Sequence, residues 1–312
     1  MNAIAELERL LAGRASLVER AEGDGASCTP DDVARAAARL RTFGLVPGDP
    51  IALVAERRTR SVTALLGALA AELAVLPIAP HHPQSRAREL INRADARLVI
   101  GDATSGPPGA PTCGFDALLD DLAAPVPRAR RHGVALPQAG TIVETSGSSG
   151  RPKLCVHALD AHLSSARAAA KELDLDVDDR WLLSLPLHHV GGLAILFRSI
   201  VSGATVVMPA PDERTGDAVA RTSPTRVSMV ATQLADALED RSATHALRAA
   251  RTVLAGGGPI PLALRQRAVA LSIPLVVSYG STEAASMIAA SPALLSAPSR
   301  VVPLAVITSF PI

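Results

Sequence analysis

The chain has few aromatic residues, few cysteines, almost no net charge and no long hydrophobic run. Aromatic side chains make up 2% of its 312 residues, which argues against the stacking platforms that bind single-stranded nucleic acid. The net charge of +1 argues against nucleic-acid binding through bulk electrostatics. We therefore expect no nucleic-acid partner.

The three cysteines, Cys28, Cys113 and Cys155, are widely spaced and form no Cys-x-x-Cys pair. This usage is typical of reduced thiols and predicts a cytoplasmic protein. The uncharged run 64–71 is among the most apolar segments, but a membrane span needs roughly 20 apolar residues. Residues 1–14 combine acidic residues with apolar ones at helical spacing, which predicts an amphipathic helix rather than a signal peptide. We expect no membrane association.

What the chain does contain is an alternation of predicted helices and strands, which indicates an α/β fold with mainly parallel sheets. Helices are predicted over 30–41 (with Thr29 as N-cap), 60–73 and 85–94, and strands over 51–55, 75–78, 98–100, 181–185, 204–208, 226–230, 252–255 and 275–278. Residues 102–137 are rich in Pro, Gly, Ala and Arg and predict a connection with little regular structure. We divide the chain into α/β subdomains over 1–139 and 140–290 and a tail over 291–312.

One segment, TSGSSGRPK (145–153), combines glycines, hydroxyl groups and a lysine directly after a predicted strand end at Ile142 and Val143. Glycines let backbone N–H groups close on an anion, and lysine adds a positive charge, so the segment predicts a phosphate-binding loop. A Gly/Ser-rich surface turn is the alternative. A Walker A loop is excluded, because Pro152 precedes Lys153 where that motif needs glycine, and no Ser or Thr follows.

Two adjacent histidines follow the predicted strand 181–185, in the segment LPLHHVGG (185–192). Ligands of α/β sheets bind at strand ends, so His188 and His189 are candidates for shaping a carboxylate pocket. A buried structural histidine is one alternative. A metal site is another, but it lacks a third ligand nearby. An acyltransferase motif would need an acid a few residues later, and residues 190–194 contain none.

Two more segments follow predicted strands, LAGGGPIP (254–261) and SYGSTE (278–283). Three glycines allow a flat ring to approach the backbone, although a Gly-Pro turn explains them equally well. In the second segment, Tyr279 is suited to stack on a base, Thr282 to donate to a phosphate and Glu283 to ligate Mg²⁺. The alternative is a strand end with a helix N-cap and a first-turn acid.

In this order and spacing, the four motifs resemble the adenylate-forming acyl-CoA synthetase superfamily. The connecting segments 178–209 and 224–234 look like those of the o-succinylbenzoate–CoA ligases of menaquinone biosynthesis, and 45–54 and 65–80 fit the N-terminal subdomain of the family. The resemblance covers about residues 27 to 290. It implies two stacked α/β subdomains with mainly parallel sheets.

The family activates a carboxylic acid with ATP to an acyl-adenylate and then transfers the acyl group to CoA. The resemblance therefore implies ATP, Mg²⁺, CoA and a small carboxylic acid as ligands. It implies that Lys153 and the loop hold the β- and γ-phosphates, that Thr282 contacts the α-phosphate, that Glu283 ligates Mg²⁺ and that His189 lines the acyl site. The implied nucleotide- and acyl-binding residues are Thr145, Ser146, Gly147, Ser148, Ser149, Gly150, Gly256, Gly257, Gly258, Ser278, Tyr279 and Gly280.

The chain also departs from the family pattern. Glu144 lies where an apolar or aromatic residue is usual, and Leu154 replaces a small residue. No Thr-Gly-Asp segment follows Glu283, and the Thr-Gly-Asp at 215–217 lies upstream of the triple glycine. No lysine follows Lys171. We expect the C-terminal lid domain of the family to be absent. Adenylation should then be slow, and thioester formation slower or absent, unless a separate chain supplies that part.

The leading hypothesis is thus an acid–thiol ligase of the o-succinylbenzoate type. A non-catalytic nucleotide- or acyl-binding protein of the same fold is one alternative. Adenylation of another aryl or fatty acid is a second. ATP binding without turnover would favour the first alternative, and turnover of a different acid the second. The sequence leaves open which acid is used and whether the chain forms a homo-oligomer.

Overall fold

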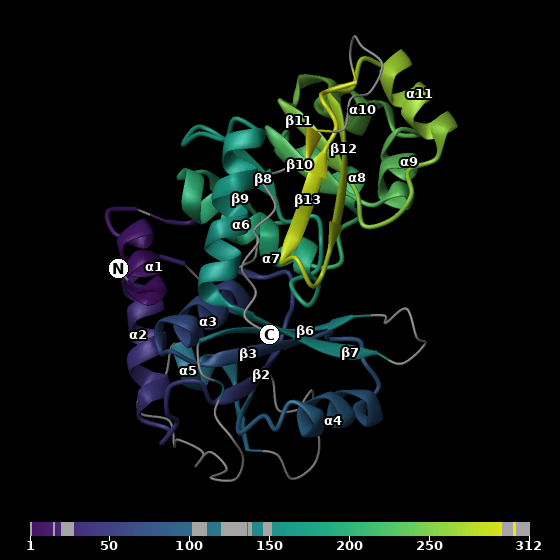
Figure 1. The fold of residues 1–312 in the computed structure, drawn as a ribbon. Coiled ribbons are helices and arrows are strands. Elements are labelled where there is room, and N and C mark those ends of the chain that lie inside the picture. The colour runs from purple at the N-terminus through teal and green to yellow at the C-terminus, as the bar shows by residue number, and fades with distance from the viewer. Residues whose placement is uncertain are drawn as a thin grey trace. The chain divides into compact units, whose positions relative to one another are not determined.

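Two β-sheets, one in each of two units of the chain, form the framework of the computed structural model (Figure 1). The structure describes residues 2–14, 16–19, 28–101, 111–119, 136, 139–145, 152–294 and 302–303. The first unit comprises Met1–Val18, Asp24–Ala161 and Pro186–His189, and the second comprises Glu19–Gly23, His162–Leu185 and Val190–Ile312. Both are α/β structures with mainly parallel sheets, so the predicted fold class is confirmed.

The sheet of the first unit has six strands, and all neighbours are parallel except the last pair. Every residue of its two central strands, β2 and β3, is buried, as expected for parallel strands covered on both faces. The strand order is β5 (Thr112–Cys113), β4 (Val99–Ile100), β2 (Pro50–Val54), β3 (Ala74–Ile78), β6 (Gly140–Thr145) and β7 (Lys153–Ala158).

Helices α1 (Ala3–Leu11), α2 (Pro30–Arg41), α3 (Thr59–Ala70) and α4 (Gln84–Arg93) accompany this sheet. Thr29 caps α2 as predicted, since its hydroxyl accepts from the backbone N–H of Asp32 while the Asp32 carboxylate accepts from the N–H of Thr29. In Figure 1, α4 lies on the opposite side of the sheet from α3. Both faces of the sheet are therefore covered.

Part of the segment predicted to have little regular structure is ordered. Strand β5 and helix α5 (Phe115–Leu119) lie within 102–137, and Cys113, Phe115 and Leu118 are buried. The prediction is wrong for these residues, because a few buried apolar side chains order a short segment that is flanked by Pro and Gly. Residues 102–110, 120–135 and 137–138 lie outside the described part of the chain.

The sheet of the second unit has eight strands. The five central strands β9, β8, β10, β11 and β12 are parallel, and β13 is antiparallel to β12. The strand order is β1 (Val18–Glu19), β9 (Thr205–Val207), β8 (Arg180–Leu182), β10 (Arg226–Met229), β11 (Thr252–Ala255), β12 (Leu275–Ser281), β13 (Ser286–Ala290) and β14 (Val302–Pro303).

Helices cover both faces of this second sheet. One face packs on α8 (Thr215–Thr222), α9 (Ala231–Ala237), α10 (Arg241–Ala249) and α11 (Leu262–Ala270) in a core that includes Leu182 of β8. Successive side chains of a strand point to opposite faces, and the neighbouring Trp181 lies under Arg198 of α7 (Val190–Ser202). Helix α7 therefore covers the other face, where His162 of α6 (Leu159–Glu172) stacks on its Phe197.

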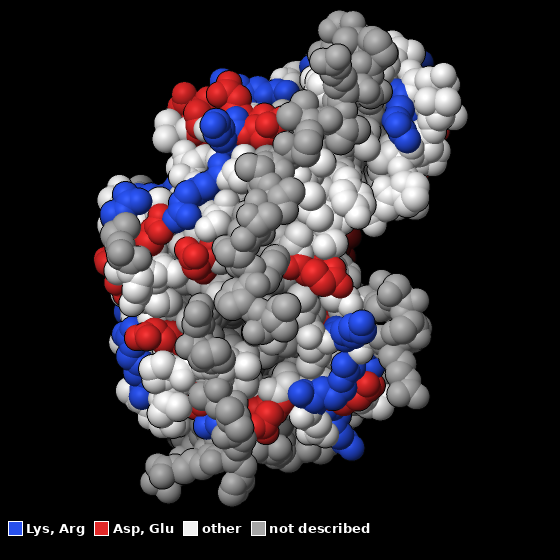
Figure 2. All heavy atoms as spheres, viewed as in Figure 1, with Lys and Arg blue, Asp and Glu red and all other residues white. Residues whose placement is uncertain are grey.

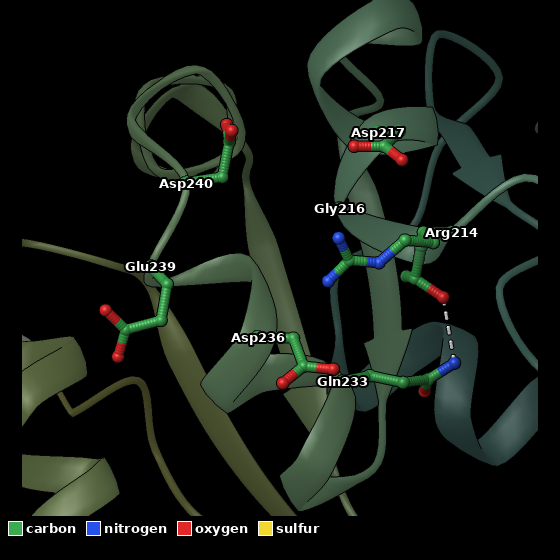
Figure 3. Close-up of a pocket in the computed structure, with 8 residues that line it drawn as sticks. Arg214, Gly216, Asp217, Gln233, Asp236, Glu239 and Asp240 are labelled. Carbon is green, nitrogen blue, oxygen red and sulfur yellow. Dashed lines mark hydrogen bonds between the residues drawn. The ribbon is translucent and has the colours of Figure 1, made fainter.

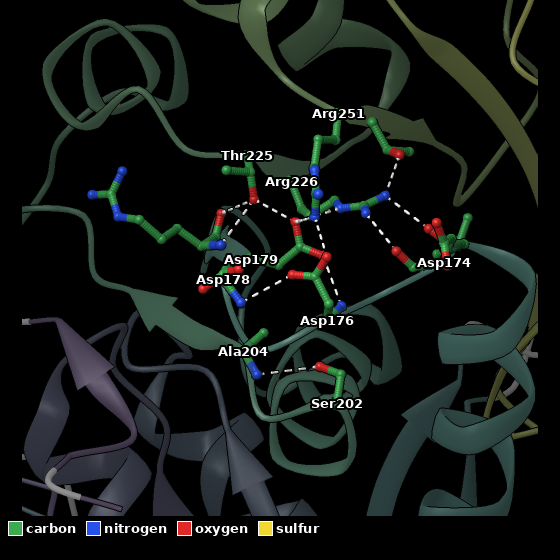
Figure 4. Close-up of polar contacts among 12 residues, drawn as sticks. Asp174, Asp176, Asp178, Asp179, Ser202, Ala204, Thr225, Arg226 and Arg251 are labelled. Atoms are coloured by element: carbon green, nitrogen blue, oxygen red, sulfur yellow. Dashed lines mark hydrogen bonds and ion pairs between the residues drawn. The ribbon is translucent and has the colours of Figure 1, made fainter.

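A buried ion-pair network joins the amino ends of β8, β10 and β11 (Figure 4). The carboxylate of Asp179, whose side chain is 0% exposed, lies 2.9 Å from Arg226 and 3.2 Å from Arg251, and it accepts a hydrogen bond from Thr225 at 2.7 Å. Arg226 also donates to the carbonyl of Asp174 at 2.8 Å and to the hydroxyl of Thr252 at 2.6 Å. The network therefore lies at the amino ends of these parallel strands, whereas the triple glycine and SYGSTE lie at the carboxyl ends of β11 and β12.

None of the three cysteines, Cys28, Cys113 and Cys155, forms a disulfide. Burial raises the pKa of the Cys28 and Cys113 thiols to about 11, so both are protonated at neutral pH. Within the described residues, no helix combines the length and the apolar character that crossing a membrane requires.

Candidate active site

The predicted phosphate-binding segment closes a β-hairpin in the first unit. Strands β6 and β7 are antiparallel, and Thr145 at the end of β6 pairs with Lys153 at the start of β7. The Lys153 side chain is exposed. Directly opposite residues of an antiparallel pair point to the same face, so the hydroxyl of Thr145 and the amine of Lys153 share one face of the hairpin. The loop residues Ser146, Gly147, Ser148, Ser149 and Gly150 lie outside the described part of the chain.

In the second unit, the triple glycine and the SYGSTE segment meet at the carboxyl ends of β11 and β12. The two strands pair in parallel, with Ala255 opposite Val277, so the residues that follow each strand emerge side by side. The Ser278 hydroxyl donates to the carbonyl of Ala255 at 3.3 Å. The N–H of Gly256 donates to the Met229 carbonyl at the end of β10 at 3.1 Å. The carboxyl ends of three parallel strands thus converge here.

Two of the three glycines are required by this geometry. A Cβ on Gly256 would overlap the Ser278 hydroxyl, and Gly257 has a φ of +78°, a conformation that L side chains rarely adopt. A Cβ on Gly258 would meet nothing within 4 Å. The first two glycines therefore form a close backbone approach between strands, and the third leaves open space beside them.

SYGSTE lies on a β-hairpin, so the alternative prediction of a helix N-cap after residue 278 is wrong. Strand β12 continues to Ser281, which pairs with Ser286 of β13, and Thr282 and Glu283 occupy the turn between them. The Ser281 hydroxyl accepts from the N–H of Ala284 at 3.3 Å, a local bond that stabilises a turn. Tyr279 is 67% exposed, so its ring is available to stack on a planar ligand.

A small pocket adjoins this hairpin. It has a volume of about 120 Å³ and includes Ser278 and Tyr279 among its lining residues, which are otherwise mainly apolar: Arg265, Val277, Ala289, Ser291 and Leu294. The pocket places a hydroxyl and a phenol ring beside an apolar wall, which is the kind of surface that suits a flat organic group.

His188 and His189 occupy a turn before α7 and belong to a cluster of four histidines in the first unit. The ring of His188 lies 4.3 Å from that of His189, 5.9 Å from that of His81 and 6.4 Å from that of His82, measured between centroids. Burial, followed by the charges of its three neighbours, lowers the pKa of His188 to about 3. Burial and His81 also lower the pKa of His189, so His188 and His189 are both neutral at pH 7.

Arg198 is a candidate that the sequence patterns missed. Its side chain lies in the apolar helix α7 and is 3% exposed. The guanidinium donates to the Ser286 hydroxyl at 3.0 Å and lies 5.5 Å from the centre of the Trp181 ring. Burial lowers the pKa of Arg198 to about 10, and among the described residues no carboxylate pairs with it. The only signal in the sequence is a single charge within the run LAILFRSIV.

Ser286 links Arg198 to the SYGSTE hairpin. Because Ser286 pairs with Ser281, the guanidinium contacts the base of the turn that carries Thr282 and Glu283. A buried charge without a counterion costs free energy unless an anion pairs with it. Arg198 is therefore suited to hold an anionic group close to this hairpin.

A larger polar pocket of about 350 Å³ contains none of the predicted site residues (Figure 3). It lies between the start of α8 and the segment 233–240, where Gln233 donates to the Thr215 hydroxyl at 2.9 Å. Its other lining residues are Arg214, Gly216, Asp217, Asp236, Glu239 and Asp240. Four carboxylates against one guanidinium make it a poor site for a polyphosphate.

The described residues contain no cluster of three or more His, Cys, Asp or Glu side chains that could hold a metal ion. Glu283 is exposed and has no ion-pair partner among them. Protein sites commonly bind Mg²⁺ through one or two carboxylates together with substrate phosphates. A single free carboxylate on this turn therefore fits such a site when a polyphosphate supplies the remaining oxygen ligands.

Comparison with known proteins identifies the class to which this fold and these strand-end motifs belong. Residues 29–305 match the family of AMP-binding enzymes, and the chain belongs to this family. A 2-succinylbenzoate–CoA ligase from Bacillus licheniformis is 32% identical over 263 residues, which make up 82% of this chain and 54% of the relative. The chain thus spans about half the length of this curated relative.

Solved structures agree with this assignment. The o-succinylbenzoate CoA synthetase from Bacillus subtilis, in complex with the acyl-adenylate intermediate OSB-AMP, has a TM-score of 0.74 at 25% identity over 93% of this chain and 60% of its own. The N-terminal subdomain of Klebsiella oxytoca NpsA, in complex with 3-hydroxyanthranilyl-AMSN, has a TM-score of 0.78 at 19% identity over 92% and 74%. The latter likeness concerns the fold alone. The resemblance predicted from the four motifs is confirmed.

Proposed function

We propose that the chain activates a carboxylic acid with ATP to an acyl-adenylate, as an acid–thiol ligase of the o-succinylbenzoate type that passes the acyl group to CoA. The observation that carries this proposal is the convergence of LAGGG and SYGSTE at neighbouring carboxyl strand ends in a member of the AMP-binding family. A strand-end site of this kind is where α/β sheets bind nucleotides.

The proposed reaction is a displacement at the α-phosphorus of ATP, in which a carboxylate oxygen forms the new bond and pyrophosphate leaves. Such a reaction depends on positioning and charge stabilisation more than on covalent help from the protein. Lys153 and Thr145, which share one face of the β6–β7 hairpin, are assigned to the β- and γ-phosphates together with the loop residues 146–150. Thr282 is assigned to the α-phosphate.

The base and the acyl group are assigned to the triple glycine, to SYGSTE and to His189. Gly256, Gly257 and Gly258 provide the flat backbone surface, Ser278 and Gly280 border it, and the exposed ring of Tyr279 stacks on the base. Glu283 is assigned as the Mg²⁺ ligand, and the ion, when bound, neutralises charge on the phosphates. His189 is assigned to the lining of the acyl site and stays neutral at pH 7, because its pKa is lowered.

The substrate class follows from Arg198. The relatives' names specify 2-succinylbenzoate, an acid with two carboxylates, and adenylation consumes only one of them. The buried guanidinium of Arg198, which no carboxylate of the described residues neutralises, is suited to pair with the second. We therefore favour a dicarboxylic aryl acid over a fatty acid. We also propose a cytoplasmic site of action, because the three cysteines form no disulfide.

The experiment is to incubate the purified chain with ATP, Mg²⁺ and 2-succinylbenzoate and to detect the acyl-adenylate by mass spectrometry. Lys153→Ala should lower the yield at least about 10-fold, because a charged hydrogen-bond donor to phosphate contributes about 1.5–3 kcal/mol. The matched control is Lys171→Ala, which removes the only other lysine of the chain, an exposed residue at the end of α6.

An adenylate that disappears in Lys153→Ala but persists in Lys171→Ala supports the assignment. ATP binding without any adenylate, across a panel of aryl and fatty acids, would replace it with a non-catalytic nucleotide- or acyl-binding role. Adenylation of another acid in preference to 2-succinylbenzoate would contradict the proposed substrate.

A further inference from the structure

The end of the β6–β7 hairpin that carries Lys153 is a ribbon of only two strands. Strand β6 pairs with β3 only through Gly140 and Thr141. Residues 142–145 pair only with β7, which is the edge strand of the described sheet. Figure 1 shows this ribbon extending past β2 and β3, above α4. Two-stranded ribbons are marginally stable by themselves, so other contacts must hold this end in place.

Helix α4 supplies apolar contacts to one face of the ribbon. Ile142 of β6 belongs to a buried cluster with Leu90 and Ile91 of α4, and Leu154 of β7 packs against it. Side chains alternate along a strand, so Glu144 shares the face of Ile142. Thr145 and Lys153 lie on the opposite face. Helix α4 therefore supports the ribbon from behind the face that presents the lysine.

The same helix also makes a polar contact with each strand. Arg86 forms an ion pair with Glu144 of β6, and both side chains are mostly buried, at 24% and 22% exposed. Arg93, two turns further along α4, donates to the carbonyl of Pro152 at 2.8 Å. Glu144 and Pro152 are the residues directly before Thr145 and Lys153. The two contacts thus flank the last rung of the ribbon on both strands.

We propose that Arg86, Arg93 and Glu144 are positioning residues that fix the Thr145–Lys153 rung for the β- and γ-phosphates of ATP. The inference rests on the proposed function, because it takes Lys153 as a phosphate ligand. It also explains Glu144, which lies where the family usually has an apolar or aromatic residue. The carboxylate anchors the ribbon to α4, and Arg86 neutralises a negative charge that would otherwise oppose polyphosphate binding.

The ion pair predicts an unequal response to the removal of its two partners. In Glu144→Gln, Arg86 keeps a second carboxylate partner, Glu89 of α4. In Arg86→Gln, a mostly buried carboxylate is left without its partner, which costs more. We expect ATP affinity to fall about 3-fold in Glu144→Gln and about 10-fold in Arg86→Gln. The double variant should bind ATP as well as Glu144→Gln alone, because coupled residues are not additive.

Two measurements on the full chain test the proposal. Calorimetry compares the Kd of ATP with that of AMP, which lacks the β- and γ-phosphates. Only the ATP value should change in the variants. Hydrogen exchange should accelerate at the 144–145 and 153–154 amides and stay unchanged at the far end of the hairpin, at 140–141 and 157–158. The matched control is Arg88→Gln, an exposed arginine of α4, which should change neither quantity.

Unchanged hydrogen exchange in Arg86→Gln and Glu144→Gln would overturn the positioning role, whatever the nucleotide affinities. Equal weakening of ATP and AMP would also overturn it, since this indicates general loss of structure. Lys153→Ala separates the two claims. If it weakens ATP alone while the Arg86 and Glu144 variants do not, the proposed function survives and this inference fails. If Lys153→Ala leaves ATP binding intact, both fail.

Discussion

At the scale of single residues, Arg198 offers the sharpest test of substrate class. Its guanidinium is buried and stacks near Trp181, and its only side-chain acceptor in the described chain is Ser286. Replacing a buried charge by an apolar side chain of similar size is often neutral for stability, so Arg198→Met should fold.

We expect Arg198→Met to raise the Kd of 2-succinylbenzoate about 10- to 100-fold, because a hydrogen-bonded carboxylate loses its charged partner. Calorimetry measures this change. An analogue that lacks one of the two carboxylates should bind wild type and variant alike. An equal loss for both acids would show that Arg198 shapes the pocket without recognising the second carboxylate.

The sequence could predict residues that belong to motifs, and it could not predict Arg198. The pairing of Ser278 with the triple glycine follows from two motifs at adjacent strand ends, and the structure places them together. Arg198 carries no motif, and its burial depends on a contact with Ser286, 88 residues later in the chain. Long-range contacts of this kind cannot be read from spacing in one sequence.

At the scale of elements, the close approach of β11 and β12 makes Gly256 a sensitive position. A Cβ there would overlap the Ser278 hydroxyl, whereas a Cβ on Gly258 would meet open space. We expect Gly256→Ala to lower the free energy of unfolding by about 1–3 kcal/mol, the usual effect of overpacking. Gly258→Ala should be neutral or stabilise by up to about 1 kcal/mol. Urea denaturation of both variants measures the difference, and equal effects would contradict this geometry.

The network at the amino ends of the strands should respond to pH. Burial by itself raises the pKa of Asp179, but hydrogen bonds from Arg226, Thr225 and the Asp176 N–H outweigh it and hold the pKa below its ordinary value. Because the pKa of Asp179 is lower in the folded state, its ionised carboxylate stabilises the fold. This stabilisation is fully present at pH values above the ordinary pKa of about 3.9. This stabilisation is lost as the pH falls through the lower, folded value.

We therefore expect Asp179→Asn to lower the free energy of unfolding by about 3–5 kcal/mol at pH 7, since Arg226 would remain buried without its partner. The difference from wild type should shrink as the pH falls below about 4. Urea titrations across this range measure it. Asp178→Asn, at an exposed neighbouring position, is the control and should have little effect. A difference that does not change with pH would argue against the ion pair as its cause.

Most elements could be predicted because their signals are local. The capped helix 30–41 and the strand 252–255 have the predicted bounds. The predicted strand ends are wrong where contacts with residues later in the chain determine how far a strand extends. Strand β12 runs three residues beyond the predicted end at Ser278, because β13 pairs with it as an antiparallel partner. Strand β8 ends at Leu182 rather than 185, because the segment that follows turns toward α7.

At the scale of the whole molecule, the predicted site residues are divided between two units. Thr145, Lys153 and the histidine turn belong to the first unit, and the triple glycine and SYGSTE belong to the second. The predicted boundaries at 139/140 and 290/291 stay a prediction. If both units serve one reaction, substitutions in either should affect the same chemical step.

The measurement that tests this account most directly is ATP–pyrophosphate exchange by the purified chain in the presence of Mg²⁺. The account predicts exchange that depends on 2-succinylbenzoate and that falls at least about 10-fold in both Lys153→Ala, in the first unit, and Thr282→Ala, in the second. Exchange that occurs without any acid, or that neither substitution changes, would contradict the assignment of these residues to adenylate formation.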